Sequence, residues 1–269
     1  MQERKNKTPH HFTMTSPQPP LMDNNLPVDK LRAEKELLCL NVPVRNAIAS
    51  NGRSLSVLRP PSPSVNTLQL TDALSCQCNL NCVYCPLRKA ARETTPMTPE
   101  ERVAIWQDVY HAFRVQTLSL TLFGGEPFLD VPYIRNLLTL AAEKKLPLGS
   151  IEIVTNGTIV TPEVIDLINT HRIRSLHITL DGPANIHNTR RLTKNGEDGY
   201  SLILGNMETL LSETSVQIVI NTVLDRKNIR HYQQMVNELI TRFSPFVTGR
   251  PPRITFSAGS GCLPYMQTE

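Results

Sequence analysis

The sequence of 269 residues lacks the features that mark several broad classes of protein. No uncharged apolar run approaches the roughly 18 to 20 residues that a membrane-spanning helix requires. The charged N-terminus is followed by Pro, Gln, Thr and Asn, where a secretory signal would have an apolar stretch and a cleavage site. The net charge is only +4, and no block of about five or six Lys and Arg offers a face to nucleic acid. We therefore expect a cytoplasmic protein that binds neither membranes nor nucleic acids.

Cysteine is scarce outside one short segment. Six cysteines in a chain without a secretory signal are expected to be metal ligands or reduced thiols rather than disulfides. Four of them crowd into the segment from Cys76 to Cys85. Cys39 and Cys262 stand alone and are interpreted as ordinary thiols, because isolated cysteines usually behave as small apolar side chains. The crowded segment is therefore the candidate metal site.

Composition divides the chain into a core and flanking segments. Residues 1–28 are predicted to be a disordered tail, since they cannot bury enough apolar surface to offset chain entropy. Residues 29–65 are expected to form a short extension, with a helix early in it and a proline-rich spacer, RPPSPS, at 59–64. The core is predicted to span residues 66–258, and a hydrophobic content of 40% is sufficient for one large domain.

Apolar strand-like runs alternate with helical patterns through this core, which is typical of βα units and a parallel sheet. Strands are predicted at about 66–74, 117–123, 150–155, 174–180, 215–223 and 253–258. Three helices are predicted to begin directly after the N-cap residues Thr98, Asp130 and Thr161. Two more are predicted at about 200–213 and 228–243. Thr98, Pro99 and Glu101 form a capping box at the first of these starts. The predicted fold is α/β, a partial (β/α)6 TIM-like barrel with functional residues after the strand ends.

The first predicted strand is followed directly by CQCNLNCVYC, in which Cys78, Cys82 and Cys85 have the spacing C-x3-C-x2-C. A structural zinc site is the main alternative to a cluster site. A structural zinc site requires four ligands, usually from two pairs of Cys or His residues, and the sequence has no second C-x2-C or His pair downstream. Cys76 lies two residues before the motif and is interpreted as a bystander, or as the second-choice ligand. Three thiolates on a four-iron cluster leave one iron open to a small molecule, which indicates chemistry rather than simple electron transfer.

On this motif the sequence resembles the radical SAM superfamily, over about residues 66–258. The resemblance implies a [4Fe–4S] cluster held by Cys78, Cys82 and Cys85, with Tyr84 among the residues that bind the cofactor. In this family the open iron binds the amino and carboxylate groups of S-adenosylmethionine. The reduced cluster cleaves that molecule to methionine and a 5′-deoxyadenosyl radical. The resemblance further implies a low-potential electron donor, such as a flavodoxin or ferredoxin.

Two further motifs follow the next two predicted strands. In LFGGEP, Gly124, Gly125 and Glu126 match the family motif that holds the methionine end of S-adenosylmethionine, where glycines permit close backbone approach and oxygens accept from an ammonium group. In VTNGT, Thr155 and Asn156 are candidates to contact the same cofactor. An ordinary Asn-Gly turn is the alternative for the second motif.

The fourth predicted strand runs into ITLDGP, which is similar to the SLDGP segment of the peptide- and protein-modifying branch of the superfamily. Thr179 stands where that pattern usually has Ser. By the resemblance, Thr179 and Asp181 contact the ribose and methionine of the cofactor. Arg190 or Arg191 is expected to neutralise its carboxylate, and the sequence does not distinguish between the two.

Two single residues complete the candidate site. Asn221, near the end of the fifth predicted strand, faces the barrel mouth in the family pattern and is assigned to the cofactor. His187 lies in the loop after the fourth strand and is expected to pack or hydrogen-bond rather than to act as a base. No residue is assigned to catalysis beyond the cluster and cofactor contacts.

The resemblance implies an enzyme that abstracts a hydrogen atom from a peptide or protein substrate, like the SPASM-type, anaerobic-sulfatase-maturase-like branch. Two alternatives stay open: a radical SAM enzyme for a small molecule, and a non-catalytic iron–sulfur or zinc-binding module. SPASM-type enzymes continue beyond the barrel with cysteines for auxiliary clusters, whereas this sequence has only Cys262 after Cys85. Residues 259–269 are expected to be the start of a truncated or absent C-terminal extension.

Overall fold

The structure is a computed structural model that describes residues 66–85, 87 and 97–260. The expected N-terminal tail, the spacer, Cys39 and the expected C-terminal extension with Cys262 lie wholly or almost wholly outside these residues. Those expectations stay predictions. The described part contains nearly all of the predicted core.

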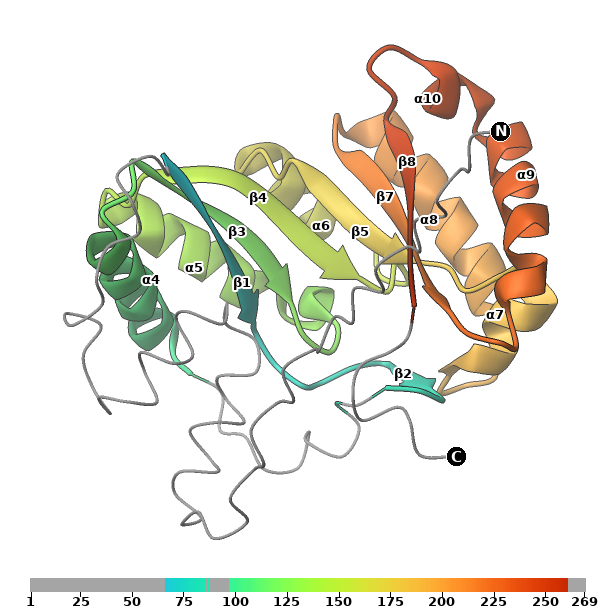
Figure 1. The fold of residues 1–269 in the computed structure, drawn as a ribbon. Helices are drawn as coiled ribbons and strands as arrows, with labels where there is room; N and C mark the ends of the chain where they lie inside the picture. The colour runs from blue at the N-terminus through green and yellow to red at the C-terminus, as the bar shows by residue number, and fades with distance from the viewer. Residues whose placement is uncertain (1–65, 86, 88–96, 261–269) are drawn as a thin grey trace, which may run out of the picture.

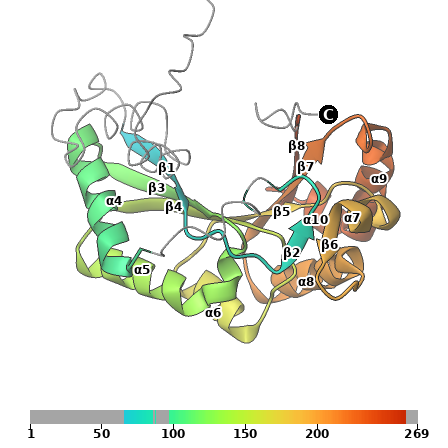
Figure 2. The same cartoon turned by 90° about the horizontal axis from the view of Figure 1, so that it is seen from below.

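Six parallel strands form one sheet in the order β1-β3-β4-β5-β7-β8, with β1 and β8 at its two edges (Figure 1). The strands are β1 (Thr67–Ala73), β3 (Thr117–Phe123), β4 (Leu148–Thr155), β5 (Ser175–Thr179), β7 (Gln217–Leu224) and β8 (Ile254–Ser260). They coincide with the six predicted runs. Parallel neighbours need crossover connections, and the connecting helices lie along the outer side of the curved sheet (Figure 2). The predicted α/β partial barrel is confirmed.

The first helices begin where the sequence places their caps. The helices are α4 (Pro99–Phe113), α5 (Val131–Glu143), α6 (Pro162–Thr170), α7 (Ala184–Arg190), α8 (Gly199–Glu213), α9 (Tyr232–Arg242) and α10 (Ser244–Thr248). The capping box of α4 is complete, since the Glu101 N–H donates to Thr98 Oγ1 at 3.2 Å and the Thr98 N–H donates to Glu101 Oε2 at 2.9 Å. Asp130 and Thr161 accept from the first turns of α5 and α6. None of the described helices is long and apolar enough to cross a membrane.

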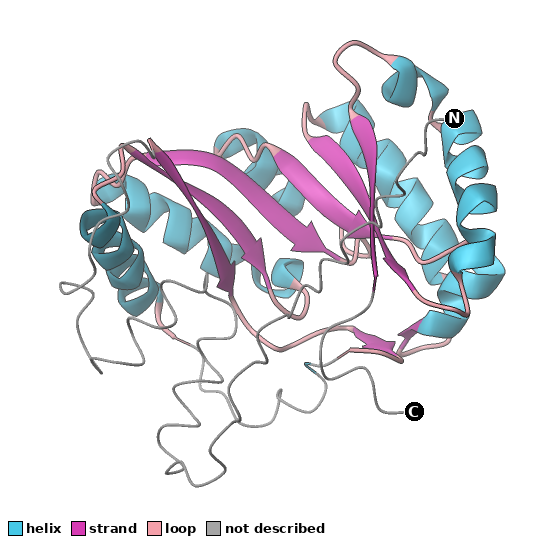
Figure 3. Cartoon of the chain, viewed as in Figure 1, coloured by secondary structure: helices cyan, strands magenta, loops and turns pink. Residues whose placement is uncertain are grey.

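Several elements were not predicted. They are the helices α7 and α10, the 3-10 turns η3 (Pro127–Asp130) and η4 (Ile229–His231), and a small antiparallel sheet of β2 (Leu80–Cys82) and β6 (Arg191–Thr193) that lies apart from the main sheet (Figure 3). The helix expected from residue 228 begins at Tyr232. The reason is that the buried Asn228 side chain donates to the carbonyls of Asp181 at 2.9 Å and Val223 at 2.8 Å. Side chains that bond backbone groups in this way compete with helix formation.

The two faces of the main sheet differ in chemistry. Successive side chains of a strand point to opposite faces. The residues that face the helices are buried and aliphatic, among them Leu118, Leu120, Leu122, Ile151, Ile153, Leu176, Ile178, Ile218 and Ile220. The alternate residues form the concave face and are mostly polar, including Gln69, Thr71, Ser119, Thr121, Glu152, His177, Gln217 and Asn221. Closed barrels usually fill this side with bulky branched residues, so the polar face is suited to water or a polar ligand.

Candidate active site

The candidate residues lie at one edge of the sheet, where the parallel strands end. In Figure 1 the arrowheads of β1, β3, β4 and β5 point toward the side on which β2 lies. The cysteine segment follows β1, the GGEP segment follows β3, and the Asn-Gly turn follows β4. Loops at the carboxyl ends of parallel strands are the usual place for active sites in such folds.

The entry of the cysteine loop is fixed by α4 and by the end of β3. Arg102 forms a buried ion pair with Asp72 and donates to the carbonyls of Ala73 at 3.1 Å and Leu74 at 3.2 Å. The Trp106 indole N–H donates to the same carboxylate, that of Asp72, at 2.7 Å. A buried charge pair of this kind contributes to stability only when its remaining donors and acceptors are satisfied, and here they are.

The glycines after β3 approach the cysteine loop itself. The Gly125 N–H donates to the Ser75 carbonyl at 2.7 Å, and the Glu126 N–H donates to the Gln77 carbonyl at 2.7 Å. A Cβ on Gly124 would lie 2.3 Å from the Ser75 oxygen, and one on Gly125 would lie 1.9 Å from the Gln77 oxygen. Gly124 also has φ +143°, which side chains rarely adopt. Close approach to the metal-site loop is therefore the structural reason for this glycine pair.

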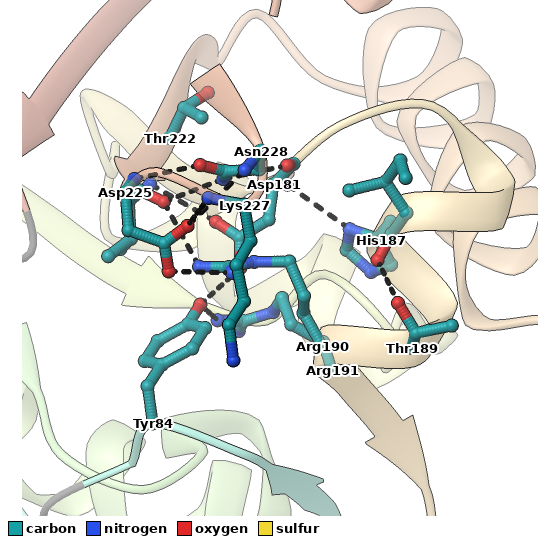
Figure 4. Close-up of polar contacts among 12 residues, drawn as sticks. Tyr84, Asp181, His187, Thr189, Arg190, Arg191, Thr222, Asp225, Lys227 and Asn228 are labelled. Carbon is teal, nitrogen blue, oxygen red and sulfur yellow. Dashed lines mark hydrogen bonds and ion pairs between the residues drawn. The ribbon is translucent and has the colours of Figure 1, made fainter. Parts of the chain in front are cut away.

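The exit of the cysteine loop is fixed by β6. Cys82 pairs with Arg191 in the β2–β6 sheet, and the Val83 N–H donates to the Arg190 carbonyl at 2.9 Å. Tyr84 then points across to the loop after β5 (Figure 4). Its hydroxyl donates to the Asp181 carboxylate and accepts from Arg191 Nη1 at 2.8 Å. The loop held by these anchors carries all three motif cysteines.

The three motif thiols are free and partly or fully buried. Burial raises the pKa of the Cys78 and Cys82 thiols, while the charge of Arg191 partly counteracts this. Metal binding requires thiolates, so it would release protons from these groups. Among the described residues, no three His, Cys, Asp or Glu side chains lie close enough to hold a single metal ion.

Glu126 is buried, with 1% of its surface exposed, and its carboxylate is already occupied by protein donors. It accepts from Thr155 Oγ1 at 2.8 Å, the Asn156 N–H at 2.6 Å and the Phe128 N–H at 3.0 Å. Burial raises the pKa of Glu126, and these three hydrogen bonds oppose that change. The side chain therefore joins the end of β3 to the end of β4, a role that the sequence did not indicate.

Asp181 is a second buried carboxylate that several donors share. It accepts from Tyr84 and from the Val223 N–H at 3.1 Å, and lies 3.6 Å from Arg190 Nε. His187 Nδ1 accepts from the Asp181 N–H at 3.4 Å, and the imidazole ring packs against Tyr200. The expectation that His187 packs or hydrogen-bonds is confirmed. Asp181 therefore joins the cysteine loop to the ends of β5 and β7 (Figure 4).

Arg190 and Arg191 differ in how many of their N–H donors are already bonded to other protein groups. Arg190 is buried, donates to Asp225 at 2.8 Å and to the Val223 carbonyl at 3.3 Å, and turns its Nε toward a carboxylate at 3.6 Å. The buried Nε atoms of both arginines lack a hydrogen-bond partner among the described residues, but Arg191 donates only through Nη1, to Tyr84, whereas Arg190 donates through both Nη atoms. Arg191 is therefore the arginine with more capacity left for an anionic ligand.

The remaining candidates lie at or near the same edge. Thr155 and Asn156 are both 3% exposed, and Thr179 is 8% exposed. Thr179 is the register partner of Asn221, so these two side chains point from neighbouring strands into the concave face. The structure thus brings all the predicted site residues to the strand ends. Their roles toward a cofactor stay predictions.

One pair on the concave face was missed by the sequence reasoning. His177 Nε2 lies 3.1 Å from Glu152 Oε2, and the two side chains are 23% and 22% exposed. The signal was present in the sequence, because both residues alternate with aliphatic residues along β4 and β5. Alternation of this kind marks the face that is not packed against helices.

Comparison with known proteins identifies relatives over the core. The radical SAM cyclopropyl synthase TigE of Paramaledivibacter caminithermalis is 24% identical over 194 residues, which is 67% of this chain and 40% of the relative. The AdoMet-dependent heme synthase of Methanosarcina barkeri is 28% identical over 161 residues, 58% of this chain and 42% of the relative. The chain thus spans less than half the length of these relatives.

Solved structures support the same fold. Native anSMEcpe with bound AdoMet superposes with a TM-score of 0.57 at 21% identity, covering 71% of this chain and 52% of that one. Native anSMEcpe with bound AdoMet and the Kp18Cys peptide gives a TM-score of 0.58 at 22% identity, covering 73% and 51%. The family model described as "Radical SAM superfamily" matches residues 74–239, which is more than half of the sequence. The chain therefore belongs to the radical SAM superfamily.

Proposed function

We propose that the chain binds a [4Fe–4S] cluster through Cys78, Cys82 and Cys85 and uses it with S-adenosylmethionine to abstract a hydrogen atom from a peptide or protein substrate. Membership in the family implies these two cofactors. When bound and reduced, the cluster supplies the electron that cleaves S-adenosylmethionine to methionine and a 5′-deoxyadenosyl radical. A low-potential donor, such as a flavodoxin or ferredoxin, would provide that electron. The observation that carries the proposal is a three-thiol loop anchored at both ends at the strand termini.

Different residues of the chain would bind different groups of S-adenosylmethionine. Arg191, whose guanidinium donates only to Tyr84 among the described residues, is suited to the carboxylate, since an arginine fork recognises carboxylates well. Thr179 and Asn221 offer polar groups on the concave side, and the backbone of Gly124 and Gly125 offers carbonyls. Glu126 and Asp181 are better suited to position these groups, because their oxygens already accept from the protein.

Three observations support a peptide or protein substrate. The LDGP segment after β5 resembles the peptide- and protein-modifying branch, and anSMEcpe, a structural neighbour, is known with a bound peptide. The concave face is polar and carries the Glu152–His177 pair, which suits the hydrogen-bonding groups of a peptide. The heme synthase relative supports a second candidate, a small-molecule substrate bound on the same face.

Anaerobic reconstitution tests the enzymatic proposal. Purified protein is incubated with iron and sulfide, reduced with dithionite in the presence of S-adenosylmethionine, and assayed for bound iron and for 5′-deoxyadenosine by chromatography. We expect about four irons per chain and formation of 5′-deoxyadenosine. Stoichiometric zinc without cleavage of S-adenosylmethionine would instead support a metal-binding module.

Isotope transfer distinguishes the two substrate classes. Deuterated candidate peptides, and separately deuterated small molecules such as porphyrin precursors, are supplied to the reconstituted protein. Because hydrogen abstraction moves one substrate atom to the 5′-carbon, the true class yields deuterated 5′-deoxyadenosine. Deuterium transferred only from the small molecules would overturn the peptide assignment while leaving the radical SAM chemistry intact.

A further inference from the structure

Asn156, Asn79 and Thr158 form a closed ring of hydrogen bonds beside Cys78. Asn156 Nδ2 donates to Asn79 Oδ1 at 2.7 Å, and Asn79 Nδ2 donates to Thr158 Oγ1 at 2.8 Å. Thr158 Oγ1 donates to Asn156 Oδ1 at 2.6 Å and closes the ring. Two of the three residues belong to the turn after β4, and the third lies in the cysteine loop. The ring therefore ties the turn after β4 to the metal-site loop.

The ring fixes which end of the Asn156 amide faces the sulfur. The Thr158 backbone N–H points at the Asn156 side chain at 2.9 Å, and a backbone N–H can only donate. The atom that it meets must be the amide oxygen, so the amino group is turned to the other side. There Nδ2 lies 3.8 Å from Cys78 Sγ and donates to it. Because Asn156 is only 3% exposed, solvent has little access to this contact.

Cys78 differs from the other two motif cysteines in its hydrogen bonds. Its sulfur accepts a second N–H, from Leu80, at 3.4 Å. No hydrogen bond to the sulfur of Cys82 or Cys85 is formed by the described residues. Hydrogen bonds to cysteine sulfur are one of the means by which a protein sets the reduction potential of an iron–sulfur cluster. The difference among the three cysteines therefore points to Cys78 as the sulfur where the protein acts on the cluster.

We propose that Asn156, oriented by Asn79 and Thr158, is a positioning residue that raises the reduction potential of the cluster through its hydrogen bond to Cys78. This inference rests on the proposed function, since it requires Cys78 to be a cluster ligand. Reduction adds negative charge to the cluster and its thiolates. An N–H dipole aimed at the sulfur stabilises that added charge, so the reduced state is favoured. The amide does this without bringing a net charge into a site that already contains the buried Glu126.

The test is the midpoint potential of the reconstituted cluster, followed by electron paramagnetic resonance during a redox titration. Asn156→Leu has nearly the same shape and removes the donor. We expect it to bind about four irons, with the ratio of reduced to oxidised cluster at a fixed potential lowered about three- to tenfold. At about 59 mV per tenfold for one electron, this is a shift of roughly 30 to 60 mV to more negative potential.

The matched control is Asn206→Leu. Asn206 Nδ2 donates to the Gly157 carbonyl at 2.9 Å, so it supports the same turn without contacting a cysteine. Its variant is expected to keep the wild-type potential. An Asn156→Leu protein with a full cluster and an unchanged potential would overturn the proposal, and so would an equal shift in the Asn206→Leu control.

A second variant decides the question if Asn156→Leu does not fold. Asn156→Asp keeps the oxygen that Thr158 requires and turns a carboxylate oxygen toward Cys78, so a larger negative shift is expected. An unchanged potential in this variant overturns the proposal. Failure of the wild-type chain to bind any cluster is a separate result, because it rejects the proposed function itself.

Discussion

The Tyr84 hydroxyl donates a hydrogen bond to the Asp181 carboxylate, joining two residues that are 97 positions apart in the sequence. Tyr84 directly precedes the last motif cysteine, and Asp181 is the second residue of the loop after β5. The contact therefore links the proposed cluster loop to the proposed cofactor-binding loop. Burial raises the pKa of Tyr84, so the phenol keeps its proton and remains a donor.

Replacing Tyr84 with Phe tests this link. The variant keeps the ring near Arg190 and removes only the hydroxyl, which leaves Asp181 and Arg191 each short of one partner. We expect the free energy of unfolding of the metal-free protein to fall by about 1 to 3 kcal/mol in urea titrations. Tyr110→Phe is the control, because the Tyr110 hydroxyl has no hydrogen bond among the described residues. Equal stabilities for the two variants would contradict the role given to Tyr84.

Single replacement of Cys78, Cys82 or Cys85 by Ala is expected to prevent cluster assembly, because a cluster with only two thiolates is poorly held. Iron content after anaerobic reconstitution should fall from about four per chain to a trace. Cys76→Ala serves as the control, since Cys76 lies in the same loop and is half-buried like Cys78. Loss of iron in the Cys76 variant together with a full cluster in a Cys78 variant would reverse the ligand assignment.

Glu126→Gln is expected to destabilise the protein as well as to weaken binding of S-adenosylmethionine. In the wild-type protein the Glu126 carboxylate accepts three hydrogen bonds. The amide of Gln has only one oxygen, so its N–H₂ group faces at least one of these donors and cannot accept from it. Leaving such a buried group unsatisfied costs about 1 to 3 kcal/mol of unfolding free energy. Thr155→Val is the comparison, because it removes only one of the three hydrogen bonds. A Gln variant with lower cofactor affinity but full stability would instead make Glu126 a direct ligand.

We expect Arg190 to contribute mainly to stability and Arg191 mainly to binding of S-adenosylmethionine. Arg191→Lys should weaken S-adenosylmethionine binding about tenfold to a hundredfold, with little loss of stability, because lysine has no forked donor for a carboxylate. Arg190→Lys should instead lower the unfolding free energy, since it disrupts the contacts with Asp225 and Val223. Calorimetry for binding and urea titration for stability measure the two effects. The opposite pattern would assign the carboxylate to Arg190.

His187 predicts a loss of stability in mild acid. Burial, with the nearby charge of Arg191, lowers the pKa of His187 to about 3. The unfolded chain titrates near its ordinary value of about 6.5, so between these values it binds a proton that the folded state does not. The unfolding free energy should therefore decrease as pH falls through this range, by about 2 kcal/mol at pH 5. His187→Gln should remove this part of the slope, whereas replacing the exposed His111 with Gln should leave it unchanged.

Much of the fold was predictable because its determinants are local. Six strands follow from apolar runs, and the starts of α4, α5 and α6 follow from caps at Thr98, Asp130 and Thr161. The β2–β6 sheet was not predictable in the same way, because each strand is only a few residues long and pairs with a partner more than a hundred residues away. The late start of α9 depends on Asn228 reaching the Asp181 carbonyl, which is also a distant contact.

The spacing of the three thiols, the positions of the motifs after the strands, and hence the family could be read from the order of residues alone. These features depend on residue type and order along one segment. The partner of each polar side chain depends instead on the packing of distant segments: Glu126 contacts Asn156, Asp181 contacts Tyr84, and Asn156 contacts Cys78. Such contacts arise when the parallel strands bring their carboxyl ends to one edge, and burial there requires each polar group to find a partner in another segment.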